Sequence, residues 1–175
     1  NKNIRNNHYG DGLITNHKEV ALGILTADCA PIFIYDLDKK FICCLHSGWK
    51  GALNNIVGKG IKIFRSNNII LCNIVVVIGP CLASRNFEVD KKFKDKFILR
   101  NDKYFKFFKS KNKTKDFFNL RGLINYQIKL EKVKNIYNVT KDTYNNNDIF
   151  FSYRRSKHQK NSQTGRMLNI ISFKN

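Results

Sequence analysis

Cys29 and His46 are the two side chains of this 175-residue chain whose types and spacing best fit a reactive centre. They flank two segments of strand-like composition, Pro31–Asp36 and Phe41–His46, which are joined by four polar residues. A loop of this length pairs the segment ends next to it and places His46 opposite Pro31. Cys29 is then diagonal to His46, and both side chains point to the same face because side chains alternate along a strand.

This diagonal arrangement permits two kinds of chemistry. Diagonal cross-strand neighbours lie about 7–8 Å apart, and zinc binds sulfur at about 2.3 Å and imidazole nitrogen at about 2.0 Å, so both side chains can reach one metal ion. They can equally form a thiolate–imidazolium pair in which Cys29 is the nucleophile. A cysteine and a histidine that merely fill core positions are the third interpretation. The residues alone leave all three open.

Residues next to this pair supply further groups suited to catalysis. Asp28 places a carboxylate beside the thiol at a strand end, where it could act as a general acid or base. After His46, small residues lead directly into a predicted helix. Free backbone N–H groups near Gly48, together with the cation of Lys50, could therefore bind phosphate. An ordinary exposed lysine is the alternative interpretation of Lys50.

Three arginines form a second candidate anion site. Arg154 and Arg155 lie at the end of a predicted strand, and Arg166 follows the polar, basic loop 156–163. Guanidinium groups bind phosphate through two parallel hydrogen bonds, so these side chains could hold a phosphate together. Scattered surface arginines would give the same pattern.

Hydrophobic periodicity predicts the elements that position these residues. Apolar stripes at helical spacing predict helices over 53–64 and 120–133. Apolar runs bounded by polar turns predict strands over 20–27, 31–36, 41–46, 69–78, 149–154 and 167–173. Gly58 and Gly60 in the first helix indicate close packing against a sheet. No repeat or linker divides the chain, so we expect one α+β domain over 1–175.

Composition and charge narrow the functional classes. Apolar residues make up 42% of the chain, which indicates a folded globular domain, and no apolar run reaches the roughly 18 residues of a membrane helix. The net charge is +19, but the densest basic stretch, 91–115, alternates lysines with aromatic residues, as in an element with one buried and one solvated face. We therefore expect neither a nucleic acid nor a membrane partner. Five cysteines without regular spacing favour a reducing, cytoplasmic environment over a disulfide framework.

Four motifs follow one another along the chain: Ala27-Asp28-Cys29-Ala30-Pro31, His46-Ser47-Gly48-Trp49-Lys50-Gly51, Ile78-Gly79-Pro80-Cys81, and Ser152-Tyr153-Arg154-Arg155 with Thr164-Gly165-Arg166-Met167. Together they resemble the laccase-domain, or polyphenol-oxidase-like, family, whose bacterial members are also described as purine nucleoside phosphorylases and peptidoglycan-editing factors. The resemblance spans nearly the whole chain. Ser47, Lys50 and Asp142 stand where alanine, arginine and cysteine are usual in that family.

The resemblance implies a fold and a metal site. The fold is a mixed β-sandwich with flanking helices, in four layers, α/β/β/α. The metal is a zinc ion bound by one cysteine and two histidines, and Cys29 and His46 match two of these ligands. The third ligand is a histidine from a segment that precedes the first motif in the family, so we expect it upstream of Asn1 and expect the domain to lack its N-terminal segment here.

The activity implied by the resemblance is zinc-dependent phosphorolysis of purine nucleosides, adenosine and inosine, to which deamination of adenosine at the same site can be added. The partners are then a small purine nucleoside and phosphate. One alternative is a metal-free Cys29–His46 hydrolase acting in peptidoglycan editing. Another is a copper-dependent polyphenol oxidase, which we rank lower because multicopper centres need many imidazoles and the chain has four histidines. A basic RNA-binding module ranks last.

Overall fold

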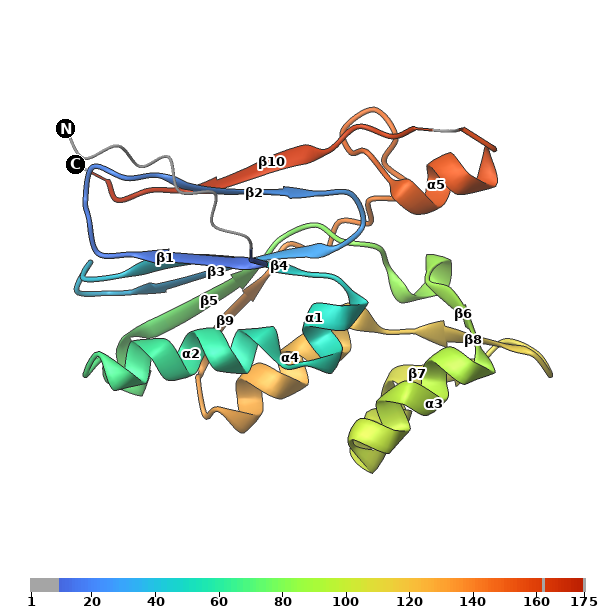
Figure 1. Ribbon diagram of the computed structural model, residues 1–175, viewed down its shortest axis with the longest axis horizontal. Coiled ribbons are helices and arrows are strands. Elements are labelled where there is room, and N and C mark those ends of the chain that lie inside the picture. The colour runs from blue at the N-terminus through green and yellow to red at the C-terminus, as the bar shows by residue number, and fades with distance from the viewer. Residues whose placement is uncertain (1–9, 162, 175) are drawn as a thin grey trace.

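The computed structural model describes residues 10–161 and 163–174, in which strands and helices follow one another along the chain (Figure 1). The strands are β1 (Gly12–Thr15), β2 (Leu22–Thr26), β3 (Ala30–Asp36), β4 (Ile42–Ser47), β5 (Ile74–Ile78), β6 (Glu88–Asp90), β7 (Phe108–Ser110), β8 (Lys115–Phe118), β9 (Asn135–Asn138) and β10 (Met167–Ile171). The helices are α1 (Trp49–Leu53), α2 (Ile56–Ser66), α3 (Lys91–Arg100), α4 (Leu120–Leu130) and α5 (Tyr153–His158), with short 3-10 turns at Leu71–Asn73, Ser84–Asn86 and Asp102–Phe107. None of the helices in these residues is long and apolar enough to cross a membrane.

A five-stranded sheet in the order β1-β4-β3-β5-β9 forms the centre of the molecule. Strands β3 and β4 are antiparallel, and their register places Pro31 opposite His46, as the loop length predicts. At the other end of the hairpin, the Asp36 carboxylate accepts hydrogen bonds from the backbone N–H groups of Lys40 and Phe41. This short-range closure of the loop stabilises the register, because a slip by one residue would turn every buried side chain to the opposite face.

A two-stranded ribbon of β2 and β10 packs on one face of this sheet. The side chains between the ribbon and the sheet are apolar, with Leu22, Ile42 and Cys44 buried and Val20, Ile24, Phe33, Tyr35, Ile171 and Phe173 packed around them. Helices α1, α2 and α4 lie on the opposite face of the sheet (Figure 1). The expected mixed β-sandwich with flanking helices is confirmed. In the described residues, α5 lies beyond one end of β10 (Figure 1).

The predicted helix over 53–64 is broken near its start, since Leu53 ends α1 (Trp49–Leu53) and the rest of the prediction lies in α2, which begins at Ile56. Asn55 interrupts it with a left-handed backbone (φ 52°), and its side chain caps α2 by accepting a hydrogen bond from the N–H of Gly58. Asparagine adopts this conformation more readily than most residues and is a favoured helix cap. The predicted close packing against the sheet is confirmed at Gly60, where an added Cβ would lie 2.9 Å from the Cδ1 of Ile34.

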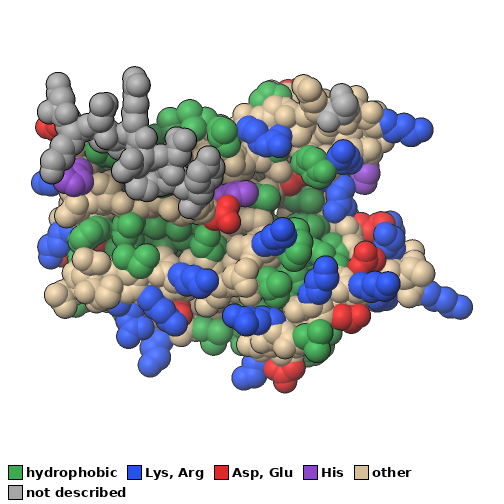
Figure 2. Space-filling view, in the orientation of Figure 1, with side chains coloured by type: hydrophobic (Ala, Val, Ile, Leu, Met, Phe, Trp, Pro, Cys, Tyr) green, Lys and Arg blue, Asp and Glu red, His purple; other side chains and the backbone are tan. Residues whose placement is uncertain are grey.

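An aromatic part of the main hydrophobic core joins α3 to the three-stranded sheet β6-β8-β7. It consists of aromatic rings with centroids 4.9–6.4 Å apart, namely Phe87, Phe93, Phe97, Phe108 and Phe118. The basic stretch 91–115 therefore buries its aromatic side chains wholly or partly, apart from the exposed Phe105, and exposes most of its lysines, as predicted. On the face shown in Figure 2, Lys and Arg side chains are spread over several elements rather than gathered in one stripe.

Two predicted strands differ from the structure. The segment 149–154 is not a strand, because Ser152 caps α5 by accepting a hydrogen bond from the N–H of Arg155 (3.1 Å) and the helix starts at Tyr153. The segment 69–78 begins with a 3-10 turn, so that only Ile74–Ile78 pairs with its neighbours. In both cases a run of apolar residues was too short to distinguish a strand from a loop with buried or exposed apolar side chains.

Ser47 carries a buried hydroxyl that lacks a hydrogen-bond partner among the described residues. A buried hydroxyl without a partner loses its bonds to water and gains none in return. We expect Ser47→Ala to raise the free energy of unfolding by about 1 kcal/mol, measured by urea denaturation. The matched control is Ser156→Ala, which should lower it by about 1 kcal/mol, because the Ser156 hydroxyl donates to the carbonyl of Gln163 (3.0 Å). Destabilisation by Ser47→Ala would contradict this account.

Candidate functional site

The β3–β4 hairpin brings Cys29 and His46 to one end of the central sheet. Since Ala30 pairs with Ser47 and Pro31 with His46, the register continues to place Cys29 opposite Gly48 and diagonal to His46. A Cβ added to Gly48 would lie only 2.8 Å from the Cys29 Sγ. The thiol therefore occupies space that a side chain at residue 48 would fill, so that any larger residue there would displace it.

Asp11 orients the imidazole of His46. Its carboxylate lies 3.1 Å from the Nδ1 of His46, and its backbone carbonyl accepts a hydrogen bond from the His46 N–H (2.7 Å). The carboxylate also acts electrostatically on the Cys29 thiol, so both candidate ligands lie near it. An Nδ1–H bound to a carboxylate leaves Nε2 as the nitrogen that can bind a metal or accept a proton. The sequence indicated no such role for Asp11, because the pairing of β1 with β4 is a contact between distant segments.

Burial makes Cys29 a weak nucleophile in the metal-free chain. Burial is the largest of the effects that raise the pKa of the thiol to about 11; the nearby carboxylates of Asp28 and Asp11 add to it, and the Arg166 cation opposes them. Catalytic cysteines have lowered pKa values, which keep the thiolate populated at neutral pH. The environment of Cys29 therefore favours the thiolate only when another cation, such as a bound metal ion, compensates its charge.

This environment predicts the order in which the cysteines react. With a pKa near 11, roughly one Cys29 thiol in 3,000 is ionised at pH 7.5, whereas Cys72 is exposed. In the metal-free protein, iodoacetamide at pH 7.5 should modify Cys72 first and Cys29 at least about tenfold more slowly, with the Cys29 rate rising up to pH 10. Peptide mass spectrometry of timed samples measures both rates. Rapid modification of Cys29 at neutral pH would instead support the nucleophile interpretation.

A cavity of about 400 Å³ opens beside Cys29. Its walls come from the β2–β3 turn, the start of α1, the β6–β8 sheet with α3, and the start of α5, and its lining includes the aromatic side chains Trp49, Phe87, Phe93 and Tyr153. Glu88 at its edge is paired with Lys111 and Lys115, and the hydrogen bond from Lys111 holds the pKa of Glu88 below its usual value. An aromatic cavity of this size can bind a flat heterocyclic molecule.

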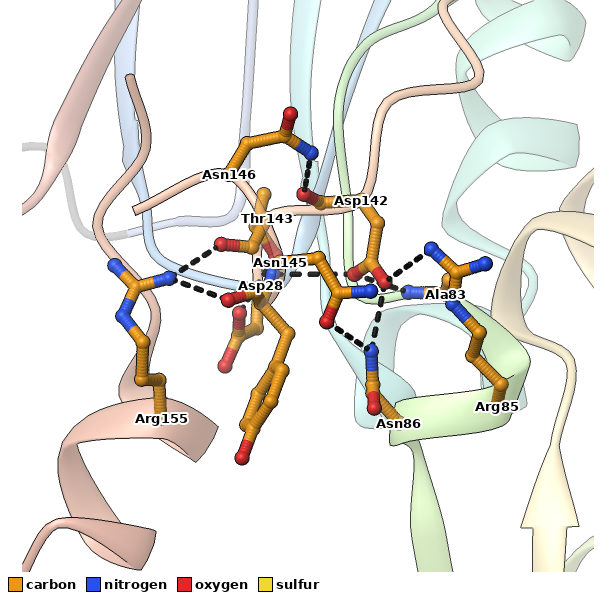
Figure 3. A network of polar contacts seen from close by, with 10 residues as sticks. Asp28, Ala83, Arg85, Asn86, Asp142, Thr143, Asn145, Asn146 and Arg155 are labelled. Carbon is orange, nitrogen blue, oxygen red and sulfur yellow. Dashed lines mark hydrogen bonds and ion pairs between the residues drawn. The ribbon is translucent and has the colours of Figure 1, made fainter. Parts of the chain in front are cut away.

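The three arginines predicted to bind phosphate lie in different surroundings. Arg154 lines the cavity, with its guanidinium 5.6 Å from the ring centroid of Phe87 and one hydrogen bond to the carbonyl of Asn86 (3.1 Å). Arg166 lines a neighbouring polar hollow together with Lys157 and Thr164. Arg155 lines neither of them, because its guanidinium donates to the carbonyls of Thr143 and Tyr144 (Figure 3) and to that of Phe150. These contacts give Arg155 a structural role in fixing the loop 143–150.

Gly48 lines the cavity, whereas Lys50 is exposed with its ammonium 5.6 Å from the ring centroid of Trp49. Helix α1 has only five residues, so its dipole is smaller than that of the longer helix predicted from the sequence. Asp28 lines the cavity as well. Both of its carboxylate oxygens accept hydrogen bonds, from the hydroxyl of Thr143 (2.7 Å) and the N–H of Arg154 (2.6 Å), and its role as an acid or base stays a prediction.

The donor atoms in the described residues suit zinc in type but are too few to complete a site. Sulfur and imidazole nitrogen are the ligands that zinc prefers. In residues 10–161 and 163–174, no group of three His, Cys, Asp or Glu side chains could hold a metal ion, and a catalytic zinc needs three protein ligands. The described histidines other than His46 lie elsewhere, with His17 between β1 and β2 and His158 in α5, bonded to the Tyr144 hydroxyl (2.9 Å). They do not form the imidazole cluster of a multicopper centre.

The sequence matches a known family along nearly its whole length. The model of the family described as multi-copper polyphenol oxidoreductase laccase matches residues 2–174. The chain belongs to this family. The resemblance drawn from the four motifs is therefore confirmed.

Relatives in this family carry a name that refers to nucleosides. Proteins named purine nucleoside phosphorylase from Rickettsia prowazekii and Rickettsia conorii are 32% and 33% identical to the chain, cover 94% of it, and are themselves covered over 68% of their length. One from Staphylococcus aureus is 31% identical over 94% of the chain and 60% of its own length. The chain thus spans between three fifths and about two thirds of these relatives.

Solved structures show the same fold. A Neisseria meningitidis protein, NMB0706, has a TM-score of 0.84 and 26% identity, over 94% of this chain and 65% of its own. The Bacillus licheniformis protein YfiH has a TM-score of 0.84 and 27% identity, over 94% of this chain and 61% of its own. The chain therefore has the same overall fold as these two proteins over nearly its whole length.

Proposed function

We propose that this protein is a zinc-dependent purine nucleoside phosphorylase acting on inosine and adenosine. The observation that carries the proposal is the aromatic cavity, which has the Cys29 thiol on one wall and the Arg154 guanidinium on another. A purine fits between aromatic side chains, and a guanidinium at the same cavity can hold phosphate. The name shared by the Rickettsia and Staphylococcus relatives supports the same activity.

Phosphorolysis exchanges one bond at the sugar for another. The bond between C1′ and N9 of the purine breaks, a phosphate oxygen forms a bond to C1′, and the purine leaves with the bonding electrons and takes up a proton. Arg154, with Arg166 in the adjacent hollow, would orient phosphate and offset its charge. The aromatic walls would hold the base and exclude water, which favours attack by phosphate over hydrolysis.

Cys29 and the Nε2 of His46 would hold the zinc ion, together with the second histidine ligand that the family resemblance implies. Zinc bound there would act as a Lewis acid and lower the pKa of an oxygen ligand. Asp11 would fix the His46 ring so that Nε2 faces the metal, as carboxylates do for many metal-binding histidines. Deamination of adenosine, which needs an activated water in place of phosphate, is a second reaction that this site could support.

The experiment is an assay of protein with a measured zinc content, incubated with inosine and with or without phosphate. Hypoxanthine and ribose 1-phosphate should appear in equal amounts only when phosphate is present. Adenosine without phosphate tests deamination, with inosine as the product. Zinc-loaded protein that forms neither product would rule out the proposal. Hypoxanthine formed without phosphate would show a hydrolase instead.

A further inference from the structure

A buried hydroxyl–carboxylate pair joins three separate segments at the wall of the cavity. Thr143 and Asp28 are 0% and 8% exposed, and the Thr143 hydroxyl donates to Asp28 Oδ1 at 2.7 Å. The other carboxylate oxygen accepts from the backbone N–H of Arg154 at 2.6 Å. Through these bonds, the turn that precedes Cys29, the loop after β9 and the start of α5 are held against one another.

Asp28 is held on its backbone side too. It has a left-handed conformation, with φ at 84°, which is uncommon for a residue other than glycine. Its carbonyl accepts a hydrogen bond from the N–H of Leu82 at 3.0 Å. A strained residue persists only where its surroundings fix it. The contacts to Thr143, Arg154 and Leu82 supply that restraint, and the direction in which Cys29 leaves the turn depends on them.

The loop that carries Thr143 is anchored independently of Asp28 (Figure 3). Arg155 donates to the carbonyls of Thr143 (2.8 Å) and Tyr144 (2.7 Å). The buried carboxylate of Asp142 accepts hydrogen bonds from the backbone N–H of Ala83 (3.1 Å) and the side-chain amide of Asn86 (2.7 Å). These bonds hold the loop in place, and with it Thr143. The Thr143 hydroxyl therefore fixes the position of the Asp28 carboxylate.

We propose that Thr143 is a positioning residue that acts through Asp28 to place Arg154 at the phosphate side of the cavity. The Arg154 side chain has one described hydrogen bond, to the Asn86 carbonyl, so the direction of its guanidinium depends on where its backbone is held. Asp28 holds that backbone, and Thr143 holds Asp28. The effect on phosphate rests on the proposed function, while the effect on the Arg154 backbone does not.

The test compares Thr143→Val, which has nearly the same shape without the hydroxyl, with Thr143→Ser, which retains it. The valine variant should raise the KM for phosphate about tenfold, because a hydrogen bond to a charged group is worth about a factor of ten or more. Its kcat at saturating phosphate should change less than threefold. The serine variant should restore the wild-type KM. Hydrogen exchange of the Arg154 amide, followed by NMR, should be at least tenfold faster in the valine variant than in wild type or the serine variant.

Thr140→Val is the matched control, because it makes the same substitution at an exposed threonine of the same loop. It should leave the phosphate KM and the Arg154 amide exchange close to wild type. An equal effect of Thr140→Val and Thr143→Val, or a Thr143→Val variant with both quantities unchanged, would overturn the proposal. If wild-type protein has no phosphorolysis, the proposed function fails, and the amide exchange alone decides whether Thr143 positions Arg154.

Asp28→Asn separates positioning from acid–base catalysis. If Asp28 acts as a general acid or base, Asp28→Asn should lower kcat by about 10²–10⁴-fold. Thr143→Val should then have nearly no effect on kcat. If Asp28 instead positions Arg154, both Asp28→Asn and Thr143→Val should raise the KM for phosphate. A drop in kcat confined to Asp28→Asn would therefore assign Asp28 to proton transfer and contradict the role proposed for Thr143.

Discussion

Replacing Cys29 with alanine should lower the kcat/KM for inosine phosphorolysis by at least about 100-fold and release zinc from the protein. We expect this because the thiol lies against Gly48 at the edge of the aromatic cavity, diagonal to His46, where we propose that both side chains bind one zinc ion. Loss of a group that only orients a metal ligand costs about 10–100-fold in affinity or activity. Loss of a ligand itself should cost at least as much. Steady-state kinetics and metal analysis on the same preparation measure both effects.

Cys72→Ala is the matched control, since it makes the same substitution at an exposed cysteine in the turn before β5. It should leave the zinc content and the kinetics unchanged. His46→Ala should reproduce the effect of Cys29→Ala, because we propose that both bind one ion. Retention of stoichiometric zinc in both site variants would refute the metal site. Loss of activity in Cys29→Ala alone, with zinc retained, would assign the cysteine a different role.

The hairpin that carries Cys29 and His46 could be predicted because its information is local. A four-residue loop and the alternation of apolar side chains determine the register, and the structure has the same pairing of Pro31 with His46. The four family motifs added the prediction of the fold class, a mixed β-sandwich with flanking helices. Local information failed at Asn55 and Ser152, where a single side chain caps a helix and overrides the apolar pattern around it.

The remainder of the site depends on contacts between distant segments. Asp11 reaches His46 across 35 residues, and Thr143 reaches Asp28 across 115. Neither has a motif or periodicity that a single sequence reveals. The same applies to Arg155, whose type and position predict anion binding but whose donors are bound by backbone carbonyls. An arginine binds phosphate only where the fold leaves its donors unpaired, and this is a property of the tertiary structure.

Replacing Phe118 with alanine should lower the free energy of unfolding by about 3–5 kcal/mol, the usual cost of truncating a fully buried phenylalanine. Phe118 is 0% exposed, and its ring lies 4.9 Å from that of Phe97 and 5.5 Å from that of Phe93. Since Phe93 also lines the cavity, the variant should raise the KM for inosine as well. Phe105→Ala, at a phenylalanine that is 61% exposed, should change stability by less than about 0.5 kcal/mol.

Urea denaturation of both variants measures the difference, and inosine kinetics in the absence of denaturant measure its effect on the site. A large loss of stability with an unchanged KM would mean that the aromatic cluster supports α3 without shaping the cavity. Equal stability of the two variants would contradict the packing of this region altogether. The expected result is a lower stability together with a higher KM for inosine, because the rings that form the core of the α3 region are continuous with those that line the cavity and share its rigidity.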